Sequence, residues 1–326
     1  MIGDLVNGTT TRVGEQVRDC LTGDGDCTNS TPKTYTPPGD LNSEACSADA
    51  CCVWEYIQRN LTVLFIDTNG TCNNLARSAV RLGFHDAGAW STSSGWGGAD
   101  GSIVLNADEI SRSENSGLQT IRSTALDFLE VYGDYGVGAA DLVQFMHNVA
   151  TVACPLGPRV LTYVGRHDDD TAAPVGLVPS TQSDADFLVG LFENKTFSAI
   201  DLASLIGAHT VAHQFFTELS RAGLPLDSTP GVWDTNFYSE LLSSSSPSGL
   251  FRLPSDDALR TDSRLTVSLT TFADSSTGQD IWTRRYARAY HCDSIRIRVI
   301  TDECSNSSNS IRDVVGHGLG KFYGTE

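Results

Sequence analysis

The sequence predicts a mainly α fold. Apolar residues recur at helical spacing in one segment after another from Cys46 onward, while the alternating pattern of β-strands is nearly absent. The chain has 326 residues, which is enough for one long domain or for two lobes that share a cleft. It carries 40 acidic against 22 basic residues, a formal net charge of −18. A nucleic acid partner is therefore not expected, because no basic patch could displace counterions from phosphates.

The first unit expected along the chain is an extended or disordered arm over residues 1–45. This stretch is rich in Thr, Gly, Asp and Pro and has little periodicity. Cys20 and Cys27 are spaced to close a small loop within it. The chain has nine cysteines in all, a density that favours an oxidising compartment. Acceptors of the Asn-x-Ser/Thr type also indicate a secreted, extracellular protein, and they stand at Asn7, Asn29, Asn60, Asn69, Asn194 and Asn306.

Helices are expected wherever apolar residues keep a helical period. These segments are Val53 to Phe65, Leu75 to Trp90, Gly138 to Ala153, Asp184 to Phe192, Ser198 to Phe216, Asp234 to Leu242 and Gln279 to Tyr290. Ser198 with Asp201 three residues later forms a capping-box pattern, which fixes where that helix begins. Long loops are expected at 91–102 and 165–181. No window is apolar over a transmembrane length, so a membrane partner is not expected.

Arg81 and His85 lie one turn apart on the helix expected at Leu75 to Trp90, and so on the same face. Such a pair can act on one small polar substrate, because the imidazole can move a proton while the guanidinium stabilises the charge that develops as a bond breaks. The alternative is a buried histidine with satisfied hydrogen bonds beside an arginine that serves an ordinary ion pair.

Two oxygen-rich loops follow histidine-bearing helices. A hard cation such as Ca²⁺ prefers six to eight oxygens from carboxylates, hydroxyls and backbone carbonyls. The first candidate set is Asp86, the Gly98 carbonyl, Asp100 and Ser102. The second is Thr210, Asp227, Thr229, the Val232 carbonyl and Asp234. For the first set the alternative is a turn in which Asp and Ser form local caps.

His209 lies in a helix that is too apolar for a surface residue. It could pack in the core, pair with His213 four residues on as a zinc ligand, or ligate a haem iron by itself. The Glu of an HExxH motif is missing, and no third zinc ligand follows. A haem iron needs only one protein ligand of this kind.

The motifs Arg81-x-x-Phe84-His85-Asp86 and Leu205-Ile206-Gly207-Ala208-His209-Thr210 resemble those of the secreted fungal haem peroxidases, the group of lignin, manganese and versatile peroxidases and their phenol-oxidising relatives. The resemblance runs from about Cys46 to Tyr290. It implies a two-lobed helical fold with haem b between a distal and a proximal helix. The peroxidase domain would span 46–290, with a distal lobe at about 46–160 and a proximal lobe at about 161–290, followed by an atypical tail at 291–326.

The resemblance also implies roles for single residues. Arg81, His85 and Asn115 would be catalytic, with Glu109 behind Asn115. His209 would ligate the haem iron, with Asp256 and Phe84 as further cofactor-binding residues. The two oxygen-rich sets would hold two Ca²⁺. The implied protein is a monomer that reduces H2O2 and oxidises small aromatic, phenolic donors at the haem edge; the alternative is a catalytically silent haem- and calcium-binding protein of the same fold.

The sequence departs from the specialised members of that family. Asn74, Ser78 and Phe215 stand where manganese oxidation requires carboxylates, and Ser204 stands at the position of the lignin peroxidase tryptophan. Leu226 replaces the tryptophan found beneath the haem of cytochrome c peroxidases. Trp90, Trp96 and Trp233 remain as other electron exits or as packing residues. The loop from Gly165 to Pro179 is expected to border the haem access channel.

The resemblance implies disulfides as well. They would join Cys46 to Cys52, Cys72 to Cys154, and Cys51 to a C-terminal cysteine, for which Cys304 is better placed than Cys292.

Overall fold

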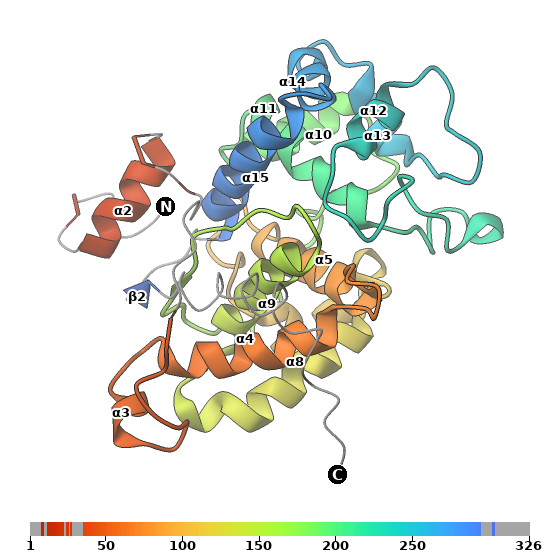
Figure 1. Cartoon of the computed structure of the whole chain (residues 1–326). Helices are drawn as coiled ribbons and strands as arrows, with labels where there is room; N and C mark the ends of the chain where they lie inside the picture. Colours follow the sequence, from red (N-terminus) through yellow and green to blue (C-terminus); the bar gives the residue numbers. More distant parts are fainter. Residues whose placement is uncertain are drawn as a thin grey trace.

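The computed structural model describes residues 8–9, 12–22, 24–25, 27, 35–294 and 302–303, with backbone alone at 13, 21, 292–293 and 302–303. The mainly α prediction is confirmed, since within these ranges helices dominate (Figure 1). The strands of the described part are β1 (Tyr163–Val164) and β2 (Asp302–Glu303), which pair antiparallel. The same part contains no helix of the length and apolarity needed to cross a bilayer.

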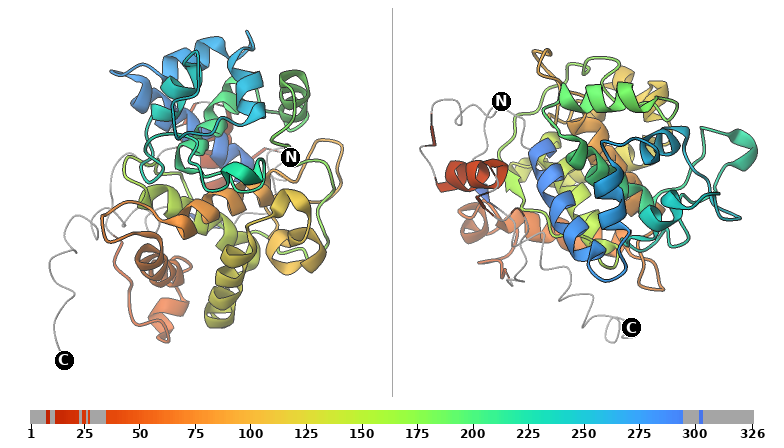
Figure 2. Two further views of the ribbon diagram at one scale, coloured as in Figure 1. Left: turned by 90° about the vertical axis from the view of Figure 1, so that its right-hand side faces the viewer. Right: turned by 90° about the horizontal axis from the view of Figure 1, so that it is seen from above.

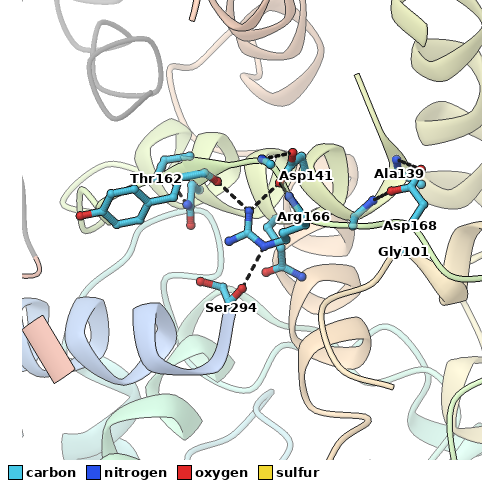
Figure 3. Close-up of polar contacts among 12 residues, drawn as sticks. Gly101, Ala139, Asp141, Thr162, Arg166, Asp168 and Ser294 are labelled. Carbon is cyan, nitrogen blue, oxygen red and sulfur yellow. Dashed lines mark hydrogen bonds and ion pairs between the residues drawn. The ribbon is translucent and has the colours of Figure 1, made fainter. Parts of the chain in front are cut away.

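One group of helices forms the lower half of the molecule in Figure 1. It consists of α4 (Cys52–Phe65), α5 (Asn74–Ala87), α8 (Gln119–Tyr132) and α9 (Ala139–Ala153). Every residue of α9 is buried, and α5 packs along it. The first turn of α9 is capped from a distance, because the Asp168 carboxylate accepts from the Ala139 and Ala140 amides at 2.8 and 2.9 Å (Figure 3). Helix α5 is thus held on a buried, fixed support.

The other group forms the upper half of Figure 1. It consists of α10 (Ala185–Glu193), α11 (Ala199–Leu205), η3 (Ile206–Val211), α12 (Asn236–Leu242), α13 (Pro254–Arg260), α14 (Thr266–Phe272) and α15 (Gly278–Ser294). Helix α15 packs on α11 and also on α5, so it joins the two groups. Its Tyr290 donates to Gln144 of α9 at 2.7 Å, and Figure 2 shows α15 near the centre of the molecule. The remaining helices of the described part are α2 (Arg12–Thr22), α3 (Glu44–Ser47), α6 (Ser102–Leu105), α7 (Ala107–Ile110), η1 (Ser113–Asn115), η2 (Gly133–Tyr135) and η4 (Leu219–Arg221).

The N-terminal arm is not wholly extended or disordered, as the prediction for residues 1–45 had it. Arg12–Thr22 forms α2, which packs against α15. Val17 and Cys20 of this helix are buried, and the expected Cys20–Cys27 disulfide is confirmed. The apolar face of α2 and this covalent link order a segment whose composition alone favours disorder.

The single helix predicted at Ser198 to Phe216 is wrong in its second half. The capping box of Ser198 and Asp201 is confirmed, but α11 ends at Leu205 and continues as the 3-10 helix η3 to Val211. From Ala212 the backbone is extended and hydrogen-bonds to residues 223–226 instead, with Gln214 N–H on the Leu224 carbonyl at 2.9 Å. Pairing with a distant segment therefore overrides the local helical period.

Helix α8 was not predicted, although Ile121, Ala125, Phe128 and Tyr132 form its buried stripe at helical spacing. The atypical tail expected at 291–326 begins as helix, because α15 runs to Ser294, with His291 and Ser294 buried. Arg166 holds this end: its Nε donates to the Ser294 carbonyl at 2.9 Å while its Nη1 pairs with buried Asp141 at 2.8 Å (Figure 3).

The Cys46–Cys52 and Cys72–Cys154 disulfides are confirmed. Cys51 is disulfide-bonded as well. Its two expected partners, the side chain of Cys292 and the whole of Cys304, lie outside what the structure describes.

Candidate active site

A cavity of about 1060 Å³ lies between the two groups of helices. Arg81, Phe84 and His85 of α5 line one side, and His209 of η3 with Asp256 of α13 lines the other. This volume is just above the range of about 300–1,000 Å³ that is usual for small-molecule and cofactor sites. The two histidine motifs, 124 residues apart by their numbers (209 − 85), thus face one space.

Asn115 fixes the orientation of the His85 ring. Its amide nitrogen donates to the backbone carbonyl of Glu109 at 2.8 Å, which turns its oxygen toward His85 Nδ1, also at 2.8 Å. The ring therefore carries its proton on Nδ1 and keeps the Nε2 lone pair as a base. Burial and the nearby charge of Arg81 lower the pKa of His85 to about 3, so the ring is neutral at ordinary pH.

Glu109 acts on Asn115 through its backbone rather than through its acid group. The carboxylate accepts from the Ala173 amide at 2.6 Å instead.

Backbone carbonyls hold the Arg81 side chain, and these contacts were not predicted from the sequence. Its two terminal nitrogens donate to the carbonyls of Ser116 and Glu114 at 2.7 and 2.6 Å, and its Nε donates to His85 Nε2 at 3.2 Å. Burial lowers the pKa of Arg81 to about 10, which still leaves the guanidinium charged at neutral pH. A fixed positive charge therefore stands beside the neutral base.

His209 has a carboxylate partner where His85 has an amide. Its Nδ1 donates to the buried Asp256 carboxylate at 2.9 Å. Burial alone would lower the pKa of His209, but the charge and hydrogen bond of Asp256 outweigh it and raise the pKa. About a third of the side chain is exposed, at 32%, and within the described ranges no hydrogen bond is made by Nε2. That nitrogen is available as a ligand from the cavity wall.

The distal oxygen-rich set gathers directly behind His85. Asp86 is fully buried, and the Gly101 amide donates to it at 3.1 Å. Burial and the neighbouring charges of Asp100 and Glu109 raise the pKa of Asp86 well above its usual value. The Ser102 hydroxyl is buried without a hydrogen-bond partner. Crowded carboxylates and an orphaned hydroxyl are what a bound Ca²⁺ would stabilise.

The proximal oxygen-rich set gathers behind His209 in the same way. The Thr210 hydroxyl donates to Asp227, and that of Thr229 donates to Asp234 at 3.0 Å. The Val232 carbonyl lies 3.4 Å from the Thr210 hydroxyl. Burial raises the pKa of Asp227 to about 7. In the described part of the chain no group of three or more His, Cys, Asp or Glu side chains is placed to hold a metal ion by itself, so hydroxyls and carbonyls would have to complete either site.

The zinc alternative is not supported, because His213 is no longer helical. Its backbone lies in an isolated antiparallel bridge opposite Pro225, and its Nδ1 donates to the Gly223 carbonyl at 2.9 Å. The break after Val211 thus removes the shared helix face that the His209/His213 pair would need.

The cavity rim matches the departures noted in the sequence. Asn74, Ser78 and Phe215 line the cavity without contributing a carboxylate. Ser204 is buried, Leu226 lines the proximal side, and Val178 and Pro179 of the predicted channel loop line the mouth. Phe215 and Phe216 are 46% and 57% exposed. Two exposed aromatic rings thus stand among the residues that line the cavity.

Tyr286 of α15 also lines the cavity, although no motif in the sequence marks it as a site residue. Tyr286 belongs to the apolar stripe of a predicted helix. The helical period predicts that this side chain is buried, but not that it lines a cavity.

Comparison with known proteins identifies this arrangement. Residues 63–275 match the family model described as Peroxidase. A peroxidase of Arthromyces ramosus is 31% identical over 254 residues, which cover 71% of this chain and 68% of the relative. Ligninase C of Trametes versicolor is 32% identical over 255 residues, covering 69% and 66%. Manganese peroxidase H4 of Phanerodontia chrysosporium is 33% identical over 242 residues, covering 66% and 62%. The resemblance to fungal haem peroxidases is thereby confirmed, and the chain belongs to the peroxidase family of H2O2-dependent oxidoreductases.

Proposed function

We propose that this peroxidase holds haem b between His85 and His209 and uses H2O2 to oxidise small phenolic donors at the cavity mouth. The observation that carries the proposal is the pair of histidines on opposite walls of one cavity, each with its Nδ1 occupied by a partner and its Nε2 left to the cavity side. When bound, haem b would supply an iron that coordinates peroxide and stores its oxidising equivalents.

On the distal side, His85 acts as the base and then as the acid. Nε2 removes the proton from the near oxygen of the peroxide and returns it to the far oxygen, which leaves as water. Arg81 stabilises the negative charge on the leaving oxygen. Because Arg81 Nε donates to His85 Nε2 at 3.2 Å, the peroxide must displace this long hydrogen bond when it enters.

On the proximal side, Asp256 makes His209 a stronger electron donor. A carboxylate that accepts from Nδ1 shifts electron density toward Nε2 and stabilises an electron-poor metal. Phe84, on the opposite wall beside His85, packs over Phe192 at a centroid distance of 6.4 Å and shapes the cavity as an apolar slot.

Three residues favour a small phenolic donor. They argue against Mn²⁺ as the donor and against a bulky aromatic donor that is oxidised at the protein surface by long-range electron transfer. Asn74 and Ser78 offer no negative charge for Mn²⁺, and Ser204 offers no indole. The exposed Phe215 and Phe216 rings give the mouth an aromatic surface on which a small ring can stack.

Two Ca²⁺ are proposed for the oxygen-rich sets, on the ground of the orphaned Ser102 hydroxyl and the raised pKa values of Asp86 and Asp227. Secretion as a monomer is proposed from the disulfides and from three exposed glycosylation acceptors, Asn60, Asn69 and Asn194. Asn7, Asn29 and Asn306 lie outside the described residues.

The test is the absorption spectrum of the haem- and calcium-loaded protein before and after one equivalent of H2O2. We expect a high-spin ferric Soret band that bleaches within seconds and returns when a phenol is added. Parallel assays with Mn²⁺ and with a non-phenolic aromatic ether should give little turnover. Efficient Mn²⁺ oxidation would contradict the donor assignment, and a Soret band indifferent to peroxide would contradict the proposed haem site.

A further inference from the structure

The back wall of the cavity carries a buried tyrosine that is hydrogen-bonded to a buried histidine. Tyr286 of α15 lines the cavity with only 2% of its surface exposed, and its hydroxyl lies 3.0 Å from Nε2 of His147, which is 0% exposed. The two residues come from different halves of the molecule, since His147 belongs to α9. Neither has a part in the peroxide chemistry described above.

The direction of this hydrogen bond follows from the neighbours of His147. The Thr162 hydroxyl donates to the Val160 carbonyl at 3.1 Å and accepts from the Asn148 amide nitrogen at 2.9 Å. The Asn148 oxygen is thereby turned toward His147 Nδ1, at 3.0 Å, and accepts its proton. Nε2 of the neutral ring then has a free lone pair, so the Tyr286 hydroxyl is the donor.

His147 and Asn148 form the same kind of hydrogen-bonded pair as His85 and Asn115. In both, an asparagine oxygen fixes the proton on Nδ1 and leaves Nε2 as a base. Burial lowers the pKa of His147 to about 3, so the ring is neutral at ordinary pH. A phenol that donates to a neutral base can lose an electron and its proton together, without leaving a charge on the phenol itself.

The pair lies directly behind α5 and is connected to η3 through Trp282. A side-chain carbon on Gly83 of α5 would come within 2.6 Å of the His147 Cβ, so the two helices touch there. On the other side Gly207 of η3 lies against Tyr238 and Trp282 in the same close manner, and the Trp282 ring is 6.3 Å from Tyr286. Tyr286 thus stands between the distal and the proximal elements, at the cavity surface.

The surroundings of Tyr286 are aromatic. Trp233 meets its ring edge-to-face at 4.8 Å, and Tyr290 stacks parallel to it at 6.0 Å. His147 in turn stacks on Tyr290 at 3.3 Å. Such closely spaced, fully buried rings hold Tyr286 in one geometry and exclude water from its hydroxyl.

We propose that Tyr286 is a redox-active residue that donates one electron to the peroxide-oxidised cofactor while its hydroxyl proton moves to Nε2 of His147. The products of this step are a neutral tyrosyl radical and a protonated His147. An external phenol later returns one electron to Tyr286 and releases its own proton to solvent, and His147 returns the stored proton to the Tyr286 oxygen. The inference rests on the proposed haem site, and H2O2 supplies the oxidant.

The test is rapid-freeze electron paramagnetic resonance of the full-length, haem-loaded enzyme mixed with one equivalent of H2O2 in the absence of donor. We expect an organic radical signal that narrows when the protein is grown with ring-deuterated tyrosine and does not change with ring-deuterated tryptophan. This comparison needs no substitution, so it does not depend on a variant folding. A signal that responds to the tryptophan label, or no organic radical despite a bleached Soret band, would overturn the proposal while leaving the peroxidase function intact. An unchanged Soret band would overturn both.

Substitutions then locate the radical. In Tyr286→Phe the tyrosyl signal should fall at least about tenfold, while Tyr290→Phe, one helical turn away, serves as the matched control and should keep it. In His147→Gln, which retains an acceptor but not a base, the signal should form more slowly, and its dependence on D2O should disappear. A full-size tyrosyl signal in Tyr286→Phe that binds haem normally would show that another residue is oxidised.

Discussion

The two walls of the cavity present the same side chain with opposite electrostatics. His85 donates from Nδ1 to a neutral amide, and burial with the charge of Arg81 lowers its pKa to about 3. His209 donates from Nδ1 to a carboxylate, which raises its pKa despite burial. The group behind each ring therefore suits its proposed role: an amide keeps the His85 ring neutral, so that Nε2 can serve as the base, and a carboxylate would make His209 an electron-rich ligand.

Removing the base is expected to have the largest effect. His85→Ala should slow the reaction with H2O2 by about 10²- to 10⁴-fold, the usual contribution of a positioned general acid–base group. The measurement is the second-order rate of Soret bleaching in stopped flow. The ferric Soret band should be retained, because His209 is untouched. A rate within about tenfold of the parent would remove His85 from this role.

Removing the negative charge of Asp256 behind His209 is expected to have the second-largest effect. Asp256→Asn keeps an acceptor near His209 Nδ1 but not the negative charge, so the reduction potential of the haem should rise and activity should fall by about 10- to 100-fold. The potential is measured by spectroelectrochemical titration. Asp257→Asn is the matched control: this carboxylate is the next residue on α13, is 49% exposed and pairs with Arg252 and Arg260. Equal potentials in the two variants would contradict the assignment of Asp256.

Giving His85 a carboxylate partner, as His209 has, should shift the pH dependence of the reaction with H2O2. With the pKa of His85 at about 3, the rate with H2O2 should stay level as pH falls from 7 to about 4 and then drop as the base takes up a proton. In Asn115→Asp the new carboxylate should raise this pKa, so the drop should begin about one to three pH units higher. Asn106→Asp, at the N-cap of α7, adds the same charge away from His85 and keeps the oxygen that accepts from the Asp108 and Glu109 amides. That control should leave the profile unchanged, and an identical profile in Asn115→Asp would contradict the hydrogen bond to His85.

The residues on these walls were predictable where the sequence carries local information. The four-residue spacing of Arg81 and His85 and the capping box at Ser198 both determine local geometry, and both are as expected. Helix α8 was not predicted, although its apolar stripe at helical spacing is local information of the same kind.

Other features depend on contacts between distant segments. The end of the helical backbone at Val211 follows from backbone pairing of 212–214 with 223–226, and no local pattern predicts it. The contact between His147 and Tyr286 joins positions 139 residues apart. Both residues occupy apolar helix faces, where the sequence predicts burial but not which polar atoms meet. The chemistry that repeats a known motif was thus visible in the sequence, and the chemistry specific to this chain was not.

Removing Ca²⁺ is expected to have the smallest effect on the peroxide reaction, and it tests a feature that the two walls share. On each, the residue directly after the histidine, Asp86 or Thr210, belongs to a proposed Ca²⁺ set. Without a cation, burial raises the pKa of Asp100 to about 6 and that of Asp227 to about 7. When folding raises the pKa of a carboxyl group, the protein loses stability as pH rises above the pKa that the group has in the unfolded chain. The free energy of unfolding of the calcium-free protein should therefore fall between about pH 4 and pH 8.

Ca²⁺ should reverse that loss, because it binds the ionised carboxylates. At about 100 times the dissociation constant, each site would add about 2.7 kcal/mol to the free energy of unfolding. We therefore expect the rise in melting temperature on adding Ca²⁺ after chelation to be large at pH 8 and small at pH 5. Mg²⁺ at equal concentration controls for screening, since its smaller, octahedral coordination fits such loops poorly. A rise of the same size at both pH values would mean that the cation binds elsewhere, and the parallel between the two walls would then end at their histidines.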